Sequence, residues 1–284
     1  MATTLSPAFV KLFEAEVHQA YQGAAVLRNI CRTRTGVVGN TAQFPKLGSG
    51  VATERTPSTD VVPVGGVFSA VTATMKDFSA SEYSDIFNQQ KVNFDERSEL
   101  AQLVGSAIGR REDQVILDAL TAATPAATVA NTVVTSGSAS ASDLNIGKIL
   151  AAKKTLDTNS VPPDNRHLII HANNLAGLLG DERAVSADFQ TIRALSNGEV
   201  NTILGFQVHM IGDRTEGGLA IDGSSDRTCF AFHRDAIGLA VGIPPKTEIN
   251  YVPEKTSFLV TSMFSAGAIS IDGNGQVDIT CRES

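Results

Sequence analysis

Five histidines are the residues of this chain best suited to proton transfer or metal binding. They are His18, His167, His171, His209 and His233. None of them forms an HxH or HExxH pair, so the sequence offers no metal ligands at short range. The phosphate-binding GxxxxGK[ST] and the hydrolase GxSxG are also absent. We therefore expect no catalytic, cofactor-binding or metal-ligating residues.

Three of the histidines, His171, His209 and His233, fall in or at the ends of predicted strands. The simpler interpretation is that each is a partly buried strand residue with a satisfied hydrogen bond. The alternative brings the three to one sheet edge, with Asp213 or Asp235 as general base, in a cytoplasmic hydrolase. Because the sequence specifies no nucleophile or metal for that site, the structural interpretation is favoured.

The cysteines Cys31, Cys229 and Cys281 are far apart and form no CxxC pair. This spacing favours a reducing compartment over a disulfide framework or a zinc site. Lys11, Glu14 and Glu16 interrupt the first residues, where a signal peptide needs an apolar core. The longest uncharged stretch, residues 119–142, is too polar for a membrane span. We expect neither secretion nor membrane insertion.

The charge balance is acidic, because 23 Lys and Arg stand against 30 Asp and Glu, a net charge of −7. A basic surface that grips nucleic acid is therefore not expected. With 284 residues, 42% hydrophobic and 19% charged, the chain is a globular protein of one large or two smaller units.

The segment from Gly36 to Gly66 is rich in glycine, proline and hydroxyl residues, which excludes a lasting helix. Residues 67–76 then alternate between apolar and polar side chains, as a strand does. Together they predict a long two-armed hairpin with a flexible tip. Such a hairpin has too few apolar residues to bury itself, so it must lean on another surface.

Two helices are expected to carry the core. The first has Asn93 as its cap and Glu96 three residues later, and its apolar stripe runs to Ala119, a length of about 40 Å. The second begins after Ser142 as its cap. Residues 5–29 show a looser helical period and predict an amphipathic helix or arm.

The second half of the chain mixes strands with a short helix. The predicted strands are RHLIIHAN, ILGFQVHMI, TCFAFH, AIGLAVG, TEINYV, SFLVTSMFSAGAISI and QVDITC, and NLAGLLGDE is the helix. DGNG, at Asp272–Gly275, is predicted to be a hairpin turn between the last two strands. The class is therefore α+β or α/β.

The order of these elements resembles the major capsid protein of tailed bacteriophages, a fold shared with encapsulins. The likeness is carried by GRREDQVILDAL, RHLIIHANNLAGLLGD, GEVNTILGFQVHM and CFAFHRDAIGLAVG. The resemblance implies an α+β fold with an N-terminal arm at 1–40 and an extended loop, the E-loop, at 41–91. It also implies a peripheral domain with the spine helix at 92–160 and 249–284, and an axial α/β domain at 161–248.

In function, the resemblance implies a structural protein that is not an enzyme. Pentamers and hexamers would close an icosahedral head around double-stranded DNA without sequence-specific binding. The protein would be located in the virion capsid, which would be assembled in the cytoplasm of the host bacterium. Since the arm begins almost at Met1, a separate scaffolding protein is expected, together with a portal. The alternatives are an encapsulin-like shell around a cargo protein and the hydrolase described above.

Contacts between subunits are expected from two groups of residues. The loop contributes Phe44, Lys46, Arg55 and Val67, and the arm contributes Arg28, Arg32 and Arg34. The arginines either form a solvated face or pair with an acidic surface of another subunit. Lys46 and Lys76 are the lysines available for a side-chain cross-link, but the sequence assigns none.

Overall fold

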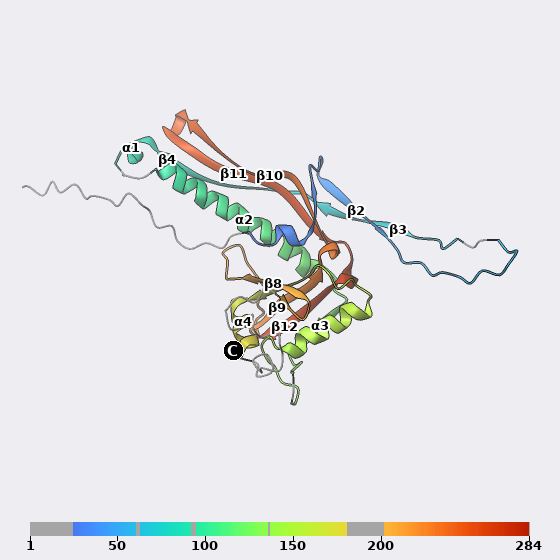
Figure 1. Cartoon of the computed structure of the whole chain (residues 1–284). Helices are drawn as coiled ribbons and strands as arrows, with labels where there is room; N and C mark the ends of the chain where they lie inside the picture. The colour runs from blue at the N-terminus through green and yellow to red at the C-terminus, as the bar shows by residue number, and fades with distance from the viewer. Residues whose placement is uncertain (1–24, 61–62, 92–94, 136, 181–201, 284) are drawn as a thin grey trace, which may run out of the picture.

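The computed structural model describes residues 25–60, 63–91, 95–135, 137–180 and 202–283. Figure 1 shows an elongated body made of a long sheet with one long helix beside it, a second sheet with helices below, and a hairpin that projects to one side. Among the described residues, no helix is long and apolar enough to cross a membrane.

A four-stranded sheet forms the elongated part of the molecule, with the strand order β1-β10-β11-β4. Its strands are β1 (Arg32–Thr35), β10 (Ile237–Val252), β11 (Ser257–Ser270) and β4 (Lys76–Asp85). Helix α2 (Glu96–Ala122) packs along this sheet and contacts three of its strands, β4, β10 and β11. This is the long helix that the apolar stripe predicts; its predicted cap, Asn93, lies outside the described residues.

A six-stranded sheet lies below, with the strand order β5-β12-β9-β6-β8-β7. Its strands are β5 (Ala127–Val129), β12 (Gln276–Arg282), β9 (Asp226–His233), β6 (Arg166–His171), β8 (Phe206–Ile211) and β7 (Thr202–Ile203). Every residue of β6 is buried, because both faces of the sheet are covered. Helices α3 (Ile146–Thr158) and α4 (Ala172–Leu179) share one hydrophobic cluster with this sheet. On its other face, Ile169, Phe230 and Phe232 join the core beneath α2.

The predicted hairpin is confirmed as a separate two-stranded sheet. Strand β2 (Thr41–Leu47) pairs antiparallel with β3 (Phe68–Thr74) over seven positions. The remaining short elements are the helix α1 (Ile86–Gln89) and the 3-10 turns at Arg28–Ile30, Arg234–Ala236, Pro253–Lys255 and Gly273–Gly275. Of the predicted arm, residues 1–24 lie outside the described part.

The predicted cap of the second helix is wrong. Asn145, not Ser142, caps α3, and its side chain accepts a hydrogen bond of 3.0 Å from the Lys148 N–H. The Ser142 hydroxyl instead donates to the carbonyls of Asn131 and Val133. Serine and asparagine both cap helices well. Here the Ser142 hydroxyl is already hydrogen-bonded to the preceding loop, so Asn145 serves as the cap.

The predicted hairpin turn at DGNG is also wrong. The Asp272 carboxylate does accept from the Asn274 N–H and forms a tight turn. However, β11 and β12 belong to different sheets, so the turn carries the chain from one sheet to the other. Turn chemistry is local, whereas the choice of partner strand depends on contacts far along the chain.

Candidate functional site

The base of the hairpin is packed against its own chain. Ala42, Phe44, Ala73 and Met75 are buried in one cluster with Ala240 of β10. Phe44 is only 2% exposed, and its ring covers Gly238, where an added Cβ would lie 2.9 Å from ring atoms. Because residue 238 has no side chain, the Phe44 ring can pack directly on the sheet and hold the base of the hairpin there.

An ion pair fixes the edge of that base. Lys46 Nζ lies 2.8 Å from Asp272 Oδ1, which joins β2 to the turn after β11. Both side chains are about one-third exposed, so the pair orients the hairpin more than it stabilises the fold. The hairpin thus leaves the body in a defined direction.

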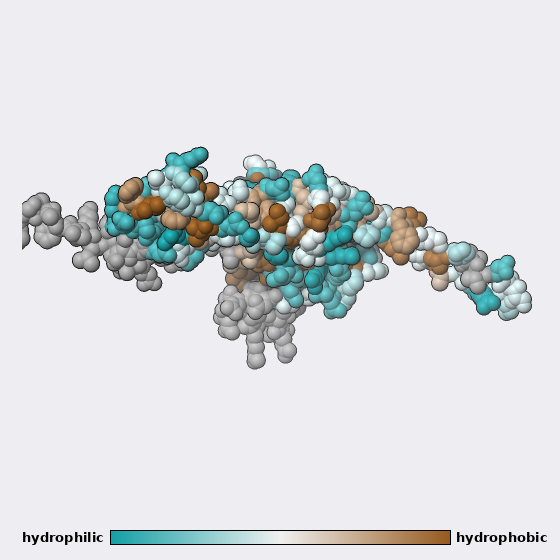
Figure 2. Space-filling model, turned by 90° about the horizontal axis from the view of Figure 1, so that it is seen from above, coloured by the Kyte–Doolittle hydropathy of each residue, from teal (hydrophilic) through white to brown (hydrophobic). Residues whose placement is uncertain are grey.

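Beyond this base, the hairpin has no covering from its own chain. We call residues 47–60 and 63–70 the distal hairpin; every one of them is exposed. Its aliphatic and aromatic side chains include Val51 at 81% exposed and Phe68 at 80%. Figure 1 shows this segment projecting away from both sheets, and Figure 2 shows hydrophobic residues on the part of the projection next to the body, while its far end is mostly hydrophilic. Several exposed aliphatic and aromatic side chains on a projecting element indicate an interaction site.

The chain belongs to the phage capsid protein family. Its match to that family covers residues 5–283, almost the entire sequence. Phage capsid proteins are structural proteins by family, and this chain is the major capsid protein of a phage head, located in the virion capsid.

Solved structures share the fold of this capsid protein. The head structure of Helicobacter pylori bacteriophage KHP40 matches with a TM-score of 0.77 and 11% identity, covering 100% of this chain and 99% of that one. The capsid of Ralstonia phage GP4 gives 0.73 and 12% identity, with 100% and 99% covered. A structure from Mycobacterium phage Che8 gives 0.70 and 17% identity, with 95% and 96% covered. The curated proteins contain no match to the chain.

The residues predicted from the loop fall into two environments in this capsid protein. Arg55 and Val67 are exposed on the distal hairpin, and Lys46 is half-buried at its edge. Phe44 lies inside the base and contacts its own chain. Phe44 therefore anchors the base of the hairpin to its own subunit.

The three predicted arginines of the arm also differ from one another. Arg28 lies 3.5 Å from the buried Glu112 of α2, and Arg34 donates a hydrogen bond of 2.9 Å to the Gln43 carbonyl. Arg32 is exposed on β1. Arg28 and Arg34 thus bind within the chain, while Arg32 faces outward at the edge strand of the sheet.

The anchor of the arm on the spine helix was missed by sequence reasoning. Asp113 is fully buried in α2 and accepts hydrogen bonds from the backbone N–H groups of Val26 and Leu27. Arg214 approaches the same carboxylate at 2.7 Å. Burial raises the pKa of the neighbouring Glu112, while Arg28 acts in the opposite direction. The signal for this anchor in the sequence was the pair of consecutive acidic residues, Glu112 and Asp113, within the apolar stripe of the spine helix.

The hypothesis of converging histidines is wrong. His171 Nε2 lies 3.2 Å from Asp213 Oδ1, whereas His209 Nε2 lies 3.1 Å from His167 Nδ1 on the adjacent strand. His233 is at the opposite end of β6, beside Arg166, and accepts from the Asp235 N–H. The parallel pairing of β6 with β8 spreads these side chains along the sheet.

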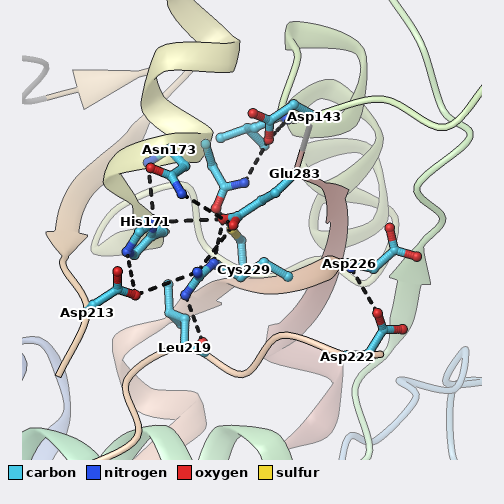
Figure 3. A network of polar contacts seen from close by, with 12 residues as sticks. Asp143, His171, Asn173, Asp213, Leu219, Asp222, Asp226, Cys229 and Glu283 are labelled. Carbon is cyan, nitrogen blue, oxygen red and sulfur yellow. Dashed lines mark hydrogen bonds and ion pairs between the residues drawn. The ribbon is translucent and has the colours of Figure 1, made fainter. Parts of the chain in front are cut away.

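The network around His171 is built to hold the chain together (Figure 3). Arg227 pairs with Glu283, and Asn173 donates to the same carboxylate, so the end of β12 is tied to α4. The nearest thiol, Cys229, is buried; a hydrogen bond with Cys281 and burial raise its pKa. A thiol held neutral is a poor nucleophile. Among the described residues, no three His, Cys, Asp or Glu side chains are grouped so that they could hold a metal ion.

Proposed function

We propose that the distal hairpin lies across a neighbouring subunit of the shell and is covered only there. The observation that supports this is its complete exposure, combined with a base that is rigidly seated by Phe44 and Lys46. Removing apolar surface from water contributes about 25 cal/mol per Å² to an interface, against which the entropy lost on association is set. Among the predicted contact residues, Arg55, Val67 and Arg32 provide exposed side chains for such contacts.

The assembly would consist of pentamers and hexamers that close an icosahedral head. A hairpin that binds a different surface of the next copy makes a head-to-tail contact, and such contacts form a ring when the rotation between copies closes. Double-stranded DNA would be enclosed without sequence-specific binding, because the net charge of −7 repels the backbone. A separate scaffolding protein and a portal would take part, and assembly would occur in the cytoplasm of the host bacterium.

The domain division follows the two sheets. The peripheral domain would consist of α2 and the four-stranded sheet, and the axial domain of the six-stranded sheet. Strand β12 pairs with β9, and α3 packs against β12, so both belong with the axial sheet. The proposed division therefore differs from the expected peripheral ranges, 92–160 and 249–284, at these two elements. It also takes β1 from the expected arm at 1–40, β4 from the expected E-loop at 41–91 and β10 from the expected axial range at 161–248.

Deletion of residues 47–63 tests the proposed role of the hairpin. Among the described residues, this change removes only exposed ones and leaves the seat of Phe44 in place, so the subunit is expected to stay soluble with near-normal helix content by circular dichroism. Electron microscopy and sedimentation are expected to find no shells. Shells of normal size from this variant would contradict the proposal.

A further inference from the structure

One loop of the six-stranded sheet is bound to the spine helix by polar contacts. The loop, residues 212–218, follows β8, and the residues on either side of it, Ile211 and Leu219, are buried in the core beneath α2. Figure 1 shows the second half of α2 lying between the four-stranded sheet and the six-stranded sheet. The loop therefore reaches from one sheet to the helix that packs on the other.

Two ion pairs connect the loop to α2. Arg110 Nε donates to both carboxylate oxygens of Glu216, at 3.0 and 3.1 Å. Arg214 Nη1 donates to Asp113 Oδ2 at 2.7 Å. All four side chains are largely shielded from water, since none is more than 14% exposed. Hydrogen bonds between charged groups are about twice as strong as those between neutral groups.

The backbone of the loop makes a third contact. The Gly218 N–H donates to Gln114 Oε1 at 2.8 Å. Gly217 and Gly218 adopt φ angles of +128° and +66°, which glycine tolerates, and a Cβ at position 217 would lie 3.3 Å from the Gln114 amide nitrogen. We call the six residues of these three contacts the helix–loop clamp: Arg110, Asp113, Gln114, Arg214, Glu216 and Gly218.

The clamp and the apolar core act differently on the packing of α2. Leu117 and Leu120 of α2 share a hydrophobic cluster with Phe230 of the six-stranded sheet. The hydrophobic effect is non-directional, so this core favours close packing without selecting a single angle. Hydrogen bonds have preferred distances and angles. Because positions 110, 113 and 114 lie on one face of the helix, three such bonds there restrict its rotation against the sheet.

We propose that the helix–loop clamp sets the angle between the two sheets and, through it, the size of the shell. The inference rests on the proposed function, in which the hairpin seated on β10 and the axial six-stranded sheet would both contact neighbouring copies. The angle between the sheets then sets the rotation from one copy to the next. A shell whose subunits meet at another rotation closes at another diameter.

Glu216→Gln tests the clamp, because it removes one charge with little change in side-chain size. The share of shells with a diameter unlike that of the unmodified protein is expected to rise at least about tenfold in electron micrographs. Gln114→Leu removes the acceptor of the Gly218 N–H and is expected to change the diameter as well.

Glu283→Gln is the matched control. Glu283 is 12% exposed and pairs with Arg227, and this pair joins the end of β12 to β9 within the six-stranded sheet. The control therefore weakens a similarly shielded ion pair without changing the contact with α2. Its subunit is expected to be less stable to urea, while its shells keep the normal diameter.

Spin labels measure the angle without relying on assembly. Gln102→Cys on α2 and Lys154→Cys on α3 place labels at exposed positions, whereas the three native cysteines are buried. Helix α3 packs on β12, so the pair of labels reports α2 against the six-stranded sheet. Double electron–electron resonance is expected to give a broader distance distribution with Glu216→Gln than without it, and no broadening with Glu283→Gln.

Unchanged diameters from both clamp variants, an unchanged distance distribution, or equal changes from Glu283→Gln would overturn the proposal and leave the proposed function intact. If the clamp variants form no shells, the distance distribution decides between the two results. An unmodified protein that forms no shells would overturn the proposed function instead, so the two failures are distinguishable.

Discussion

The carboxylate of Asp113, in the middle of the spine helix, accepts a hydrogen bond of 2.9 Å from the backbone N–H of Leu27. Both residues are completely buried. This contact places the end of the arm on α2, and Arg214 brings the loop after β8 to the same carboxylate at 2.7 Å. One side chain thus joins three segments that are distant in the sequence.

The first prediction concerns that carboxylate. Asp113→Asn removes the buried negative charge that Arg214 approaches at 2.7 Å, so the free energy of unfolding is expected to fall by about 3–5 kcal/mol. Urea unfolding of the soluble subunit measures the change. Asp118→Asn, an exposed position on the same helix, is the control and is expected to change stability by less than about 0.5 kcal/mol. Equal effects at both positions would contradict the role of Asp113.

The second prediction concerns the seat of the hairpin. Gly238→Ala places a methyl group 2.9 Å from the Phe44 ring, and this overpacking is expected to cost about 1–3 kcal/mol. Phe44→Leu in the same chain removes the clash, so the two changes should be less than additive in a double-mutant cycle. Strict additivity of the unfolding free energies would show that the ring and Gly238 are not in contact.

The third prediction is a loss of stability in acid. Burial lowers the pKa of His167 to about 4, with further lowering by His209, His233 and Arg234, and burial also lowers the pKa of His209. Because the fold favours neutral histidine, this contribution is fully present above about pH 6.5. It is lost as the pH falls toward 4.

For His167 alone the shift corresponds to about 3 kcal/mol. Unfolding in urea at pH 7, 6 and 5 measures the slope, and His167→Gln is expected to flatten it. A pKa near 6.5 for His167 in the folded protein, measured by NMR, would refute this prediction.

The fourth prediction separates assembly from folding. Val67→Ser changes a side chain that is 71% exposed on the distal hairpin, so subunit stability is expected to change by less than about 0.5 kcal/mol while the yield of shells falls. Val38→Ser is the matched control, since Val38 is 96% exposed and lies outside the hairpin. Sedimentation of both variants provides the comparison, and equal losses of shells would count against a specific role of the hairpin.

Much of the fold was predictable because it depends on residue types a few positions apart. The apolar stripe ending near Ala119 predicted α2, and the alternation at residues 67–76 predicted strand structure in the second arm of the hairpin. The poor apolar content of Gly36–Gly66 also predicted a segment that must lean on another surface, which matches the exposure of the distal hairpin but not its base, where Ala42 and Phe44 are buried against their own chain. The features that were predicted correctly are properties of the local chain, whereas the burial of the base depends on tertiary contacts.

Other features were decided only by the tertiary structure. The sequence around Asp272 specifies a turn but not that β12 joins β9 instead of β11. Likewise, the sequence does not show that the Asp113 carboxylate accepts a hydrogen bond from the backbone N–H of Leu27, which is 86 residues away. Sheet membership and buried polar partners are set by the free energy of long-range packing, which no local pattern records.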